Sequence, residues 1–412
     1  MFISDIMNKN RLLQKSKVLQ SSRRGALMIR FLQILYREGV KTIPDICGYT
    51  GMSTPTVKKM LDELIEEGLV MENGLAASGG GRRPGLYGLN PSSRQIVGIN
   101  IGRSEIRIGI FNLLCESLHP IEIINGGIET LNDIRPALKA KLEELIDSSD
   151  IQKSTILGAG IAMPGLIDTK TGISHSYFTD VKKPLATIFT ETLGMPAYIE
   201  HDTRILALGE NIYGLAKGKQ NVLCLNIGSG IGLSMILNGR LYTGNSGFSG
   251  EFGHITVDPA GEQCYCGKIG CLETLASGKT LVNIARREIH SPASTALERQ
   301  CGGKPELISL TMIVDAATNG DQYATTLLAR AGEHLGKGIA TLIHLFNPEM
   351  IIIGGKMAKA GKLLTDPIRN TMNLHTIPRI REDAEIVTSE LGLDAGIMGT
   401  IALVMENTFT SN

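Results

Sequence analysis

The hydrophobic pattern of the first ninety residues predicts three helices followed by two strands. Residues 24–39 have apolar side chains at helical spacing and end at a glycine, and a short helix with a turn around Gly51 follows. A longer helix then begins, capped by Ser53. Its core-facing stripe falls at positions i, i+3, i+4, i+7 and i+8: Val57, Met60, Leu61, Leu64 and Ile65. Two short strands enclose the glycine-rich tip "GGGRRPG", so the segment predicts a small module of its own.

Beyond residue 95 the pattern changes to apolar strands that run into glycines, separated by helical stretches. The first two strands alternate around a turn at Gly102 within residues 96–112. Further strands lie at 155–168, 222–239 and 347–355, and helical periodicity covers 131–147, 184–193, 203–214 and 322–346. This alternation predicts an α/β body of two sheet lobes, with a cleft where the glycine turns meet.

Length and composition favour a multidomain globular protein. A chain of 412 residues is too long for one ordinary core, and 42% hydrophobic with 20% charged residues is a globular composition. No apolar run reaches the length of a membrane span, and the first residues lack the apolar core of a signal peptide. We therefore expect a cytoplasmic protein with no membrane partner. Four cysteines are scattered singly, which favours reduced thiols over a disulfide framework: Cys47, Cys115, Cys224 and Cys301.

Charge is unevenly divided along a chain that is neutral as a whole. Residues 1–95 carry 14 Lys and Arg against 8 Asp and Glu, whereas the remainder has an excess of acidic side chains. A basic segment joined to an acidic body predicts a polyanion partner for the first part only. We divide the chain into a basic arm (1–23), a domain of helices and strands (24–90), a linker (91–95) and the body (96–412). The arm could instead be an additional helix or a mobile terminus.

The long helix of the first domain has the polar face of a DNA-recognition helix. Its first two turns present four side chains that can contact bases or phosphates: Thr54, Thr56, Lys58 and Lys59. Its acidic residues come later in the helix. Because a recognition helix enters the major groove by its N-terminal end, this order keeps the acids away from the phosphates.

The glycine-rich tip resembles the wing of a winged helix-turn-helix. It carries Arg82 and Arg83, followed by Pro84, and arginines on a flexible tip can enter the narrow minor groove. Taken alone, the tip could be a plain linker. Three helices, a wing and a net positive charge in this order are more specific, and they predict that residues 24–90 bind operator DNA.

Short motifs throughout the body resemble the ROK family, a group of repressors and sugar kinases. They are "MPGLID" (163–168), "HD" (201–202), "GSGIG" (228–232), "GFSGEFGH" (247–254), "CYCGKIGCLE" (264–273) and "IIIGG" (351–355). The resemblance covers nearly the whole chain and points to the family's branch of transcriptional regulators. It implies an actin-like, hexokinase-like two-lobed ATPase fold, here preceded by a winged helix-turn-helix.

The same resemblance implies a sugar site. In family kinases the residue matching Asp202 is the base that takes a proton from a sugar hydroxyl, and the matching acids and histidine contact other hydroxyls. Carboxylates accept strong hydrogen bonds from neighbouring hydroxyls, which makes the assignment chemically reasonable. We expect the sugar-binding residues to be Gly165, His201, Asp202, Glu251, His254 and Glu273.

Three cysteines and a histidine follow the spacing His-x9-Cys-x-Cys-x4-Cys. Three thiolates and one imidazole give a closed four-coordinate site with no position for water, which is typical of structural rather than catalytic zinc. The expected Zn²⁺ ligands are His254, Cys264, Cys266 and Cys271, so the zinc module covers 254–271. The metal would hold Glu251 and Glu273 towards the cleft. His254 would bind zinc through one ring nitrogen and sugar through the other.

Two departures from the family pattern bear on catalysis. Family kinases carry an Asp-x-Gly-Gly-Thr-Lys type of loop for Mg-ATP, whereas this chain has "NIGRSE", with Asn100, Arg103 and Glu105 at the changed positions. The loss of the metal-organising carboxylate and the lysine predicts poor ATP binding and no phosphoryl transfer. The second departure is His201, where the family usually has Asn. We therefore expect Asp202 to be a sugar ligand in a protein that is not an enzyme.

Together these features predict a sugar-responsive transcriptional regulator, with repression of carbohydrate uptake or catabolism genes expected. The partners would be operator DNA and a sugar or sugar phosphate. A homodimer or homotetramer is expected, because palindromic operators need paired DNA-binding domains. Two alternatives stay open: an active sugar kinase with an appended DNA-binding domain, and a regulator whose body binds another protein. The identity of the sugar and the sign of its effect also stay open.

Overall fold

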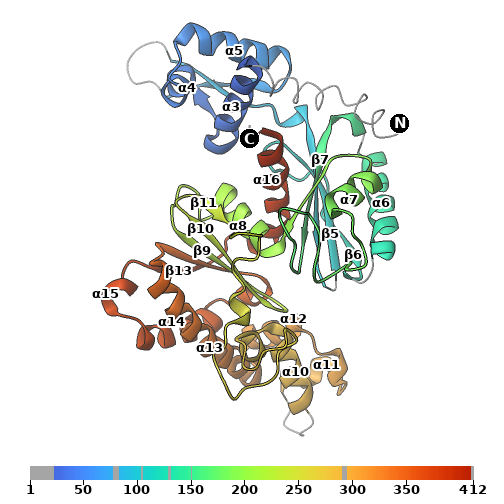
Figure 1. Ribbon diagram of the computed structural model, residues 1–412, viewed down its shortest axis with the longest axis vertical. Coiled ribbons are helices and arrows are strands. Elements are labelled where there is room, and N and C mark those ends of the chain that lie inside the picture. The colour runs from blue at the N-terminus through green and yellow to red at the C-terminus, as the bar shows by residue number, and fades with distance from the viewer. Residues whose placement is uncertain are drawn as a thin grey trace. The chain divides into compact units, whose positions relative to one another are not determined.

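The structure of the chain is a computed structural model that describes residues 23–77, 83–103, 105–128, 131–149, 151–289 and 295–409 (Figure 1). The chain divides into two compact units. The first comprises Met1–Ile167, Thr171–Glu200 and Thr400–Asn412, and the second comprises Asp168–Lys170 and His201–Gly399. The basic arm expected at 1–23 lies outside the described residues except for Arg23, which is the first residue of a helix rather than part of an arm.

The described part of the first ninety residues, 23–77 and 83–90, contains the three helices and the two strands that the sequence predicts, together with one more short strand. The helices are α3 (Arg23–Glu38), α4 (Ile43–Thr50) and α5 (Thr54–Glu66). The strands β1 (Lys41–Thr42), β3 (Gly85–Leu89) and β2 (Val70–Leu75) form an antiparallel sheet in that order. The Ala76 N–H donates to the Pro84 carbonyl and closes the base of the tip, which includes Arg82, outside the described residues.

Local signals explain where these helices begin and end. α4 starts with a capping box, in which the Asp45 N–H donates to the Thr42 hydroxyl and the Thr42 N–H donates to the Asp45 carboxylate. Gly51 ends α4 in the left-handed conformation, with φ 71°. Ser53 occupies the N-cap of α5, but the expected side-chain cap is wrong, because its hydroxyl lies 2.9 Å from the Thr56 hydroxyl and makes no cap to the backbone.

The apolar stripe of α5 forms much of the core of this domain. Val57, Met60, Leu61 and Leu64 are buried as predicted, together with Phe31 and Leu35 of α3 and Ile46 of α4. Ile65, the last position of the predicted stripe, is only half-buried. The opposite face of the first turns of α5 is therefore left to solvent.

The linker is shorter than the sequence predicts. Asn90 fixes its start, because its N–H donates to the Leu69 carbonyl and its side-chain amide donates to the Gly68 carbonyl. A single 3-10 turn follows at Pro91–Ser93. The sequence predicts Gln95 as the last residue of the linker, whereas in the structure it begins β4 and pairs with Asn112 in the first sheet of the body.

The body part of the first unit is built on a mixed five-stranded sheet. Its strand order is β6 (Glu122–Asn125), β5 (Glu105–Asn112), β4 (Gln95–Ile101), β7 (Ile156–Met163) and β8 (Ala197–His201). β4 runs antiparallel to β5 and parallel to β7. Helices α6 (Leu131–Asp147) and α7 (Leu185–Leu193) pack on one face and bury its aliphatic side chains (Figure 1). The helices and the strands β4, β5 and β7 correspond to predicted ranges, whereas the sequence analysis names no strand at β6 or β8.

Small residues on the other face of β7 admit the C-terminal helix, α16 (Ala395–Phe409). A Cβ atom added to Gly160 would lie 2.0 Å from the Thr400 carbonyl oxygen, so only glycine fits there. Further along α16, Glu406 accepts two hydrogen bonds from Arg37 of α3, at 2.7 and 2.8 Å. The C-terminal helix therefore contacts both the sheet and the first domain.

We expect Gly160→Ala to destabilise the protein, because the added methyl group forces α16 away from β7. Overpacking of this kind costs about 1–3 kcal/mol, which lowers the melting temperature by about 2–12 °C. Differential scanning fluorimetry measures the shift. Gly48→Ala is the control, because a Cβ atom there would meet nothing within 4 Å and the position is helical. A melting temperature unchanged in both variants would contradict this account of the contact.

The second unit repeats the strand order of the first. Its sheet runs β11 (Arg240–Tyr242), β10 (Ile231–Leu237), β9 (Val222–Ile227), β12 (Met350–Gly354) and β13 (Glu385–Thr388). The stretch 222–239, predicted as an apolar strand running into glycines, is a hairpin of β9 and β10. In both sheets the first strand in the chain lies at the centre, antiparallel to the second and parallel to the fourth.

Helices cover both faces of the second sheet. On one face lie α10 (Gly278–Glu288), α12 (Leu310–Thr318), α13 (Gln322–Phe346) and α14 (Lys362–His375), which form the largest buried core. On the other face α8 (Asp202–Tyr213) packs through Leu206 and Ala207. The unit also contains α9 (Glu273–Ala276), α11 (Ala296–Cys301) and α15 (Pro378–Arg381).

Two further expectations concern thiols and membranes. All seven cysteines have free thiols, including the four that are scattered singly along the sequence. Among the described residues, no helix combines the length and the apolar character needed to cross a bilayer.

Candidate metal centre and sugar site

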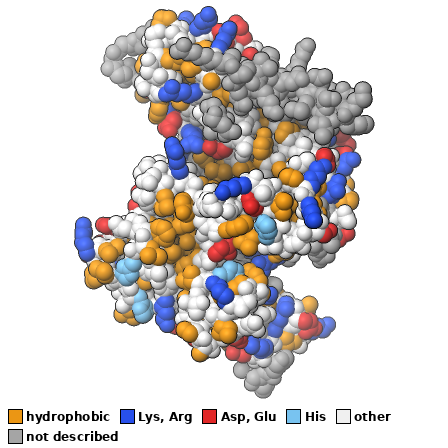
Figure 2. All heavy atoms as spheres, in the orientation of Figure 1, with side chains coloured by type: hydrophobic (Ala, Val, Ile, Leu, Met, Phe, Trp, Pro, Cys, Tyr) orange, Lys and Arg blue, Asp and Glu red, His pale blue; other side chains and the backbone are white. Residues whose placement is uncertain are grey.

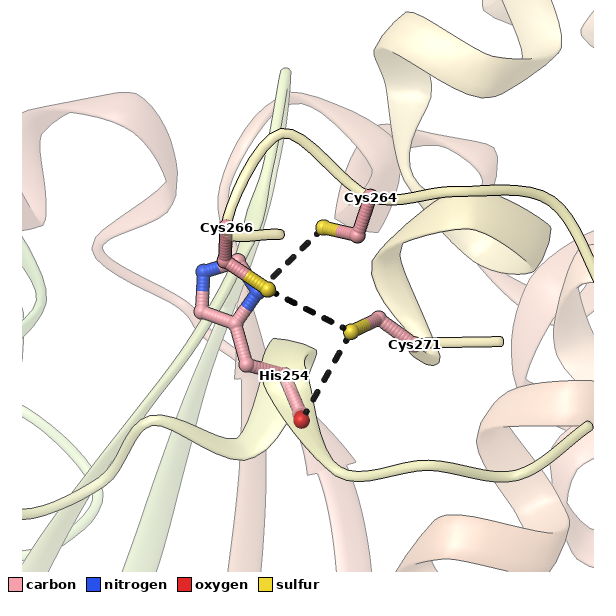
Figure 3. A group of neighbouring side chains, drawn as sticks. All are labelled: His254, Cys264, Cys266 and Cys271. Carbon is pink, nitrogen blue, oxygen red and sulfur yellow. Dashed lines mark hydrogen bonds between the residues drawn. The ribbon is translucent and has the colours of Figure 1, made fainter. Parts of the chain in front are cut away.

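The four predicted metal ligands meet in one cluster of the second unit (Figure 3). Cys264 Sγ lies 3.6 Å from His254 Nδ1, and Cys266 Sγ lies 3.6 Å from Cys271 Sγ. All four ligand atoms lie within 4.8 Å of one another, so a single ion can touch every one of them. Cys264 and Cys271 are buried, and Cys266 is exposed.

Backbone pairing brings the histidine segment and the cysteine loop together. The Leu272 N–H donates to the Ile255 carbonyl and the Val257 N–H donates to the Gly270 carbonyl. Gly270 has φ 73°, and a Cβ atom there would lie 1.5 Å from the Asp258 carbonyl oxygen, so this position requires glycine. These contacts hold the base of the loop, and the four side chains close its tip.

The environment of the thiols favours protons on the two buried ones. Burial raises the pKa of Cys271 to about 12 and raises the pKa of Cys264 above its usual value. Partial burial also acts on Cys266, but hydrogen bonds from the Lys268 backbone and the neighbouring thiols outweigh it and lower the pKa of Cys266. Metal binding to this cluster must therefore displace protons from the buried thiols.

The second ring nitrogen of His254 faces away from the thiols. Its Nε2 atom lies 3.1 Å from the Tyr265 hydroxyl and 4.0 Å from Glu251 Oε2. The rings of His254 and Tyr265 are perpendicular, with centroids 5.2 Å apart. The sequence does not predict the contact of Tyr265 with His254. Its position between two cysteines suggests that it lies near the metal ligands, but it does not say where the side chain points.

The glycine-containing segment at the start of β10 lies against Glu273, one of the predicted sugar ligands, and against the start of α8. Glu273 is buried, and its Oε2 accepts a hydrogen bond from the Ile231 N–H at 3.1 Å. A Cβ atom on Gly230 would lie 2.8 Å from the same oxygen, and one on Gly232 would lie 2.2 Å from Thr203 Oγ1. This segment therefore requires glycines so that Glu273 and the start of α8 can both approach it.

Asp202 and His201 form the start of α8. The Thr203 N–H donates to His201 Nδ1 at 3.3 Å, so the histidine caps the helix. The Thr203 hydroxyl donates to Asp202 Oδ1 at 3.2 Å, which orients the carboxylate. Asn is also a strong capping residue, so the departure from the family pattern at His201 keeps the capping role.

The remaining predicted residues of the body lie in the first unit. Gly165 has φ 94°, and a Cβ atom there would lie 2.8 Å from Ser176 and Tyr177. In the "NIGRSE" turn between β4 and β5, the Gly102 N–H donates to the Glu105 carbonyl. Ser104 of that turn lies outside the described residues.

The predicted DNA-contacting residues of α5 all lie on its solvent face. Thr54, Thr56, Lys58 and Lys59 are exposed, and so is Arg83 at the end of the tip. Figure 2 shows both basic and acidic side chains on the visible face of the first domain. No aromatic or acidic side chain interrupts the first two turns of α5.

Comparison with known proteins identifies the family. Residues 96–407 match the family model described as the ROK family, and the chain belongs to this family. It is similar to the xylose repressor of Caldicellulosiruptor bescii, with 31% identity over 360 residues that cover 86% of this chain and 89% of the repressor. It is also similar to the glucokinase of Thermotoga maritima, with 30% identity over 315 residues that cover 76% of this chain and 98% of the kinase.

A solved structure resembles this chain over nearly its whole length. It is the crystal structure of a ROK family transcriptional regulator, a homologue of the E. coli MLC protein, with a TM-score of 0.77 and 28% identity. The likeness covers 95% of this chain and 97% of that chain. The fold is thus the α/β, two-lobed, hexokinase-like fold of the family, with mixed sheets.

The relatives differ in how much of the chain they share. The glucokinase match covers 76% of the chain, which is about the share that residues 96–407 make up. The repressor match covers 86%, so it extends beyond the body into the first 95 residues. The likeness that includes the first domain is therefore a likeness to regulators.

Proposed function

We propose that the protein is a sugar-responsive, DNA-binding transcriptional regulator. Residues 24–90 act as a winged helix-turn-helix, and the body acts as the sugar sensor. The observation that carries this proposal is the exposed, acid-free start of α5 in a domain that precedes the ROK body. The similarity to a repressor and to a regulator structure over more than the body supports it. Repression of carbohydrate genes is the expected mode of action.

α5 serves as the recognition helix. Thr54 and Thr56 offer hydroxyls to base edges or phosphates, and Lys58 and Lys59 offer charge to the phosphate backbone. Arg82 and Arg83, in the segment between β2 and β3, serve as contacts to the adjacent minor groove. A homodimer or homotetramer is expected, because two copies of the domain read the two halves of a palindromic operator.

The proposed sugar ligands of the second unit are carboxylates and histidines. Asp202 and Glu251 accept hydrogen bonds from sugar hydroxyls, and His254 presents Nε2 beside Glu251. Glu273 is buried, and its Oε2 atom accepts a hydrogen bond from the Ile231 N–H, which fixes the carboxylate in position. Its other lone pairs can accept hydrogen bonds from the sugar. His201 caps α8, and its Nδ1 atom lies 3.4 Å from Asp202 Oδ1.

We propose that the cysteine cluster holds a structural Zn²⁺ ion through His254, Cys264, Cys266 and Cys271. With Zn–S bonds of about 2.3 Å and Zn–N bonds of about 2.0–2.1 Å, tetrahedral ligand atoms lie about 3.5–3.8 Å apart. Two of the observed separations are 3.6 Å. A bound ion would hold the histidine segment and the cysteine loop together. With Nδ1 bound to the ion, the ring proton of His254 would lie on Nε2, the nitrogen proposed to face the sugar.

Phosphoryl transfer is not part of the proposed function. That reaction depends on positioning and neutralising the phosphates, and Asn100, Arg103 and Glu105 replace the groups expected to do so. The glucokinase similarity covers 76% of the chain, about the share that the body makes up. A sugar kinase with an appended DNA-binding domain is therefore the alternative to test.

Helix α16 offers a route by which the sugar signal reaches the DNA-binding domain. At its start, a Cβ atom on Gly399 would lie 1.9 Å from the Ile205 carbonyl oxygen of α8, the helix that Asp202 begins. Near its end, Glu406 pairs with Arg37 of α3. A shift of α8 on sugar binding is thus passed along one continuous helix to the first domain.

Two measurements on the full-length protein test the proposed function. Selection from a library of genomic DNA fragments should recover a sequence-specific site, and fluorescence anisotropy should give a changed affinity for that site when sugar is added. A thermal-shift screen of free and phosphorylated sugars identifies the effector, because a ligand of the folded state raises the melting temperature. Binding of all fragments alike, with no effect of any sugar, would contradict the proposal.

Replacing both wing arginines, Arg82 and Arg83, with alanine should weaken operator binding and flatten its salt dependence. Each lost phosphate contact reduces the magnitude of the negative slope of log K against log salt by about 0.9. The slope of the double variant should therefore be less steep by about 1.8. Replacing Arg379 and Arg381 of α15 with alanine removes the same charge from the body and serves as the control. An unchanged slope in the wing variant would count against a role of the tip in DNA binding.

A further inference from the structure

Tyr265 lies in the metal loop between two thiol ligands, yet it is no ligand itself. Cys264 is buried, whereas the Tyr265 side chain is exposed, with 67% of its surface accessible. Its hydroxyl oxygen lies 3.1 Å from His254 Nε2. The tyrosine therefore meets the one ring nitrogen of His254 that the metal does not use.

A metal ion on His254 Nδ1 would fix the direction of the hydrogen bond between these two residues. The neutral imidazole would then carry its proton on Nε2. Nε2–H would donate to the Tyr265 oxygen, 3.1 Å away. His254 would thus position the Tyr265 hydroxyl.

Glu251 approaches the same nitrogen. Its Oε2 lies 4.0 Å from Nε2, so a sugar hydroxyl that reaches Nε2 meets Tyr265 and Glu251 as well. A carboxylate only accepts hydrogen bonds, whereas a phenol both donates and accepts. The three groups can therefore bind a hydroxyl and discriminate against a bare methylene at that position.

We propose that Tyr265 is a specificity-determining sugar contact, which rests on the sugar-sensing function proposed above. Its hydroxyl accepts from His254 Nε2–H and donates to one hydroxyl of the sugar. Its exposed ring offers an apolar surface to the neighbouring C–H groups of that sugar. The ligand class is an aldose or amino sugar that bears a hydroxyl at the position facing His254.

The test compares sugar affinities of the zinc-loaded, full-length protein and of its Tyr265→Phe variant by isothermal titration calorimetry. The first probes are D-xylose, D-glucose, N-acetyl-D-glucosamine and the 6-phosphates of the latter two. The tightest of them is then measured beside its series of monodeoxy analogues. Zinc content by elemental analysis accompanies each preparation.

The preference is the affinity for the parent sugar divided by that for a monodeoxy analogue. Tyr265→Phe should reduce it about 2- to 12-fold at a single position of the sugar, as for loss of one neutral hydrogen bond. Preferences at the other positions and the zinc content should not change. Tyr323→Phe is the matched control. It removes a hydroxyl that donates to Glu288 at 2.8 Å in the same unit, and it should leave every preference unchanged.

The outcomes separate this inference from the proposed function. Absence of binding of every probe by the wild-type protein would contradict sugar sensing itself. If the wild type binds sugar and Tyr265→Phe lowers the affinity for every analogue by the same factor, Tyr265 only positions the loop. Loss of zinc from that variant, or full retention of all preferences, would likewise overturn the specificity role and leave sugar sensing standing.

Discussion

Cys264→Ser should abolish metal binding and, with it, the response to sugar. Removing one of four ligands opens the closed site, and binding of structural zinc is worth about 10–16 kcal/mol in small zinc modules. The base of the loop is also held by backbone hydrogen bonds between 255–258 and 270–272, so we expect a local loss of order rather than global unfolding. His254 would lose its fixed orientation, and the sugar-induced rise in melting temperature should disappear.

Elemental analysis in reducing buffer should give about one zinc per wild-type chain and almost none for Cys264→Ser. Cys301→Ser is the matched control, because Cys301 is a buried thiol of the same unit that donates to the Glu298 carbonyl and lies outside the cluster. The variant should still bind operator DNA, since α3, α4 and α5 take no part in the cluster. A wild-type protein free of zinc, or a variant with full sugar response, would contradict the proposed metal centre.

Asp202→Asn should impair sugar binding without removing any catalytic turnover. The replacement keeps the shape of the side chain but removes the charge that accepts hydrogen bonds from sugar hydroxyls. Hydrogen bonds to charged groups contribute about 1.5–3 kcal/mol, so the dissociation constant should rise about 10- to 150-fold. Calorimetry with the sugar found in the thermal-shift screen measures this change. Asp315→Asn, on the exposed face of α12, makes the same change of charge and should have no effect.

The same variant decides between regulator and kinase. A coupled assay for ATP consumption should give no sugar-dependent turnover with either the wild type or Asp202→Asn, because the "NIGRSE" turn lacks the groups for Mg-ATP. Steady turnover across hexoses or amino sugars, abolished by Asp202→Asn, would instead establish a sugar kinase with an appended DNA-binding domain.

Much of the fold followed from short-range patterns. The helical periodicity at 322–346 corresponds to α13, and the alternation around Gly102 corresponds to the hairpin of β4 and β5. These signals are reliable because burial of one helix face or one strand face is a property of adjacent residues. The cysteine cluster was equally predictable from the sequence, since coordination chemistry restricts the spacing of its ligands.

The features that sequence analysis missed depend on contacts between distant segments. Arg37 and Glu406 are 369 positions apart, and no periodicity links them. Tyr265 points to His254 only because the loop folds back on residues 255–258. The missing cap at Ser53 is instead a local effect, because its hydroxyl pairs with the Thr56 hydroxyl, three residues on, and not with a backbone N–H. Local propensity is a weak guide wherever another polar group competes for the same atom.

The two body units are interleaved along the chain, whereas residues 23–90 are one uninterrupted run. No single cut separates the sheets, because the chain passes between the units near residues 167–171, 200 and 399. One junction at Asn90–Gln95 is enough to add or exchange the first domain. Recombination could therefore convert a sugar-binding body into a gene regulator in one step. A transplanted domain would need a cation at the position of Arg37 to pair with Glu406, and chimeras that lack one should bind DNA without responding to sugar.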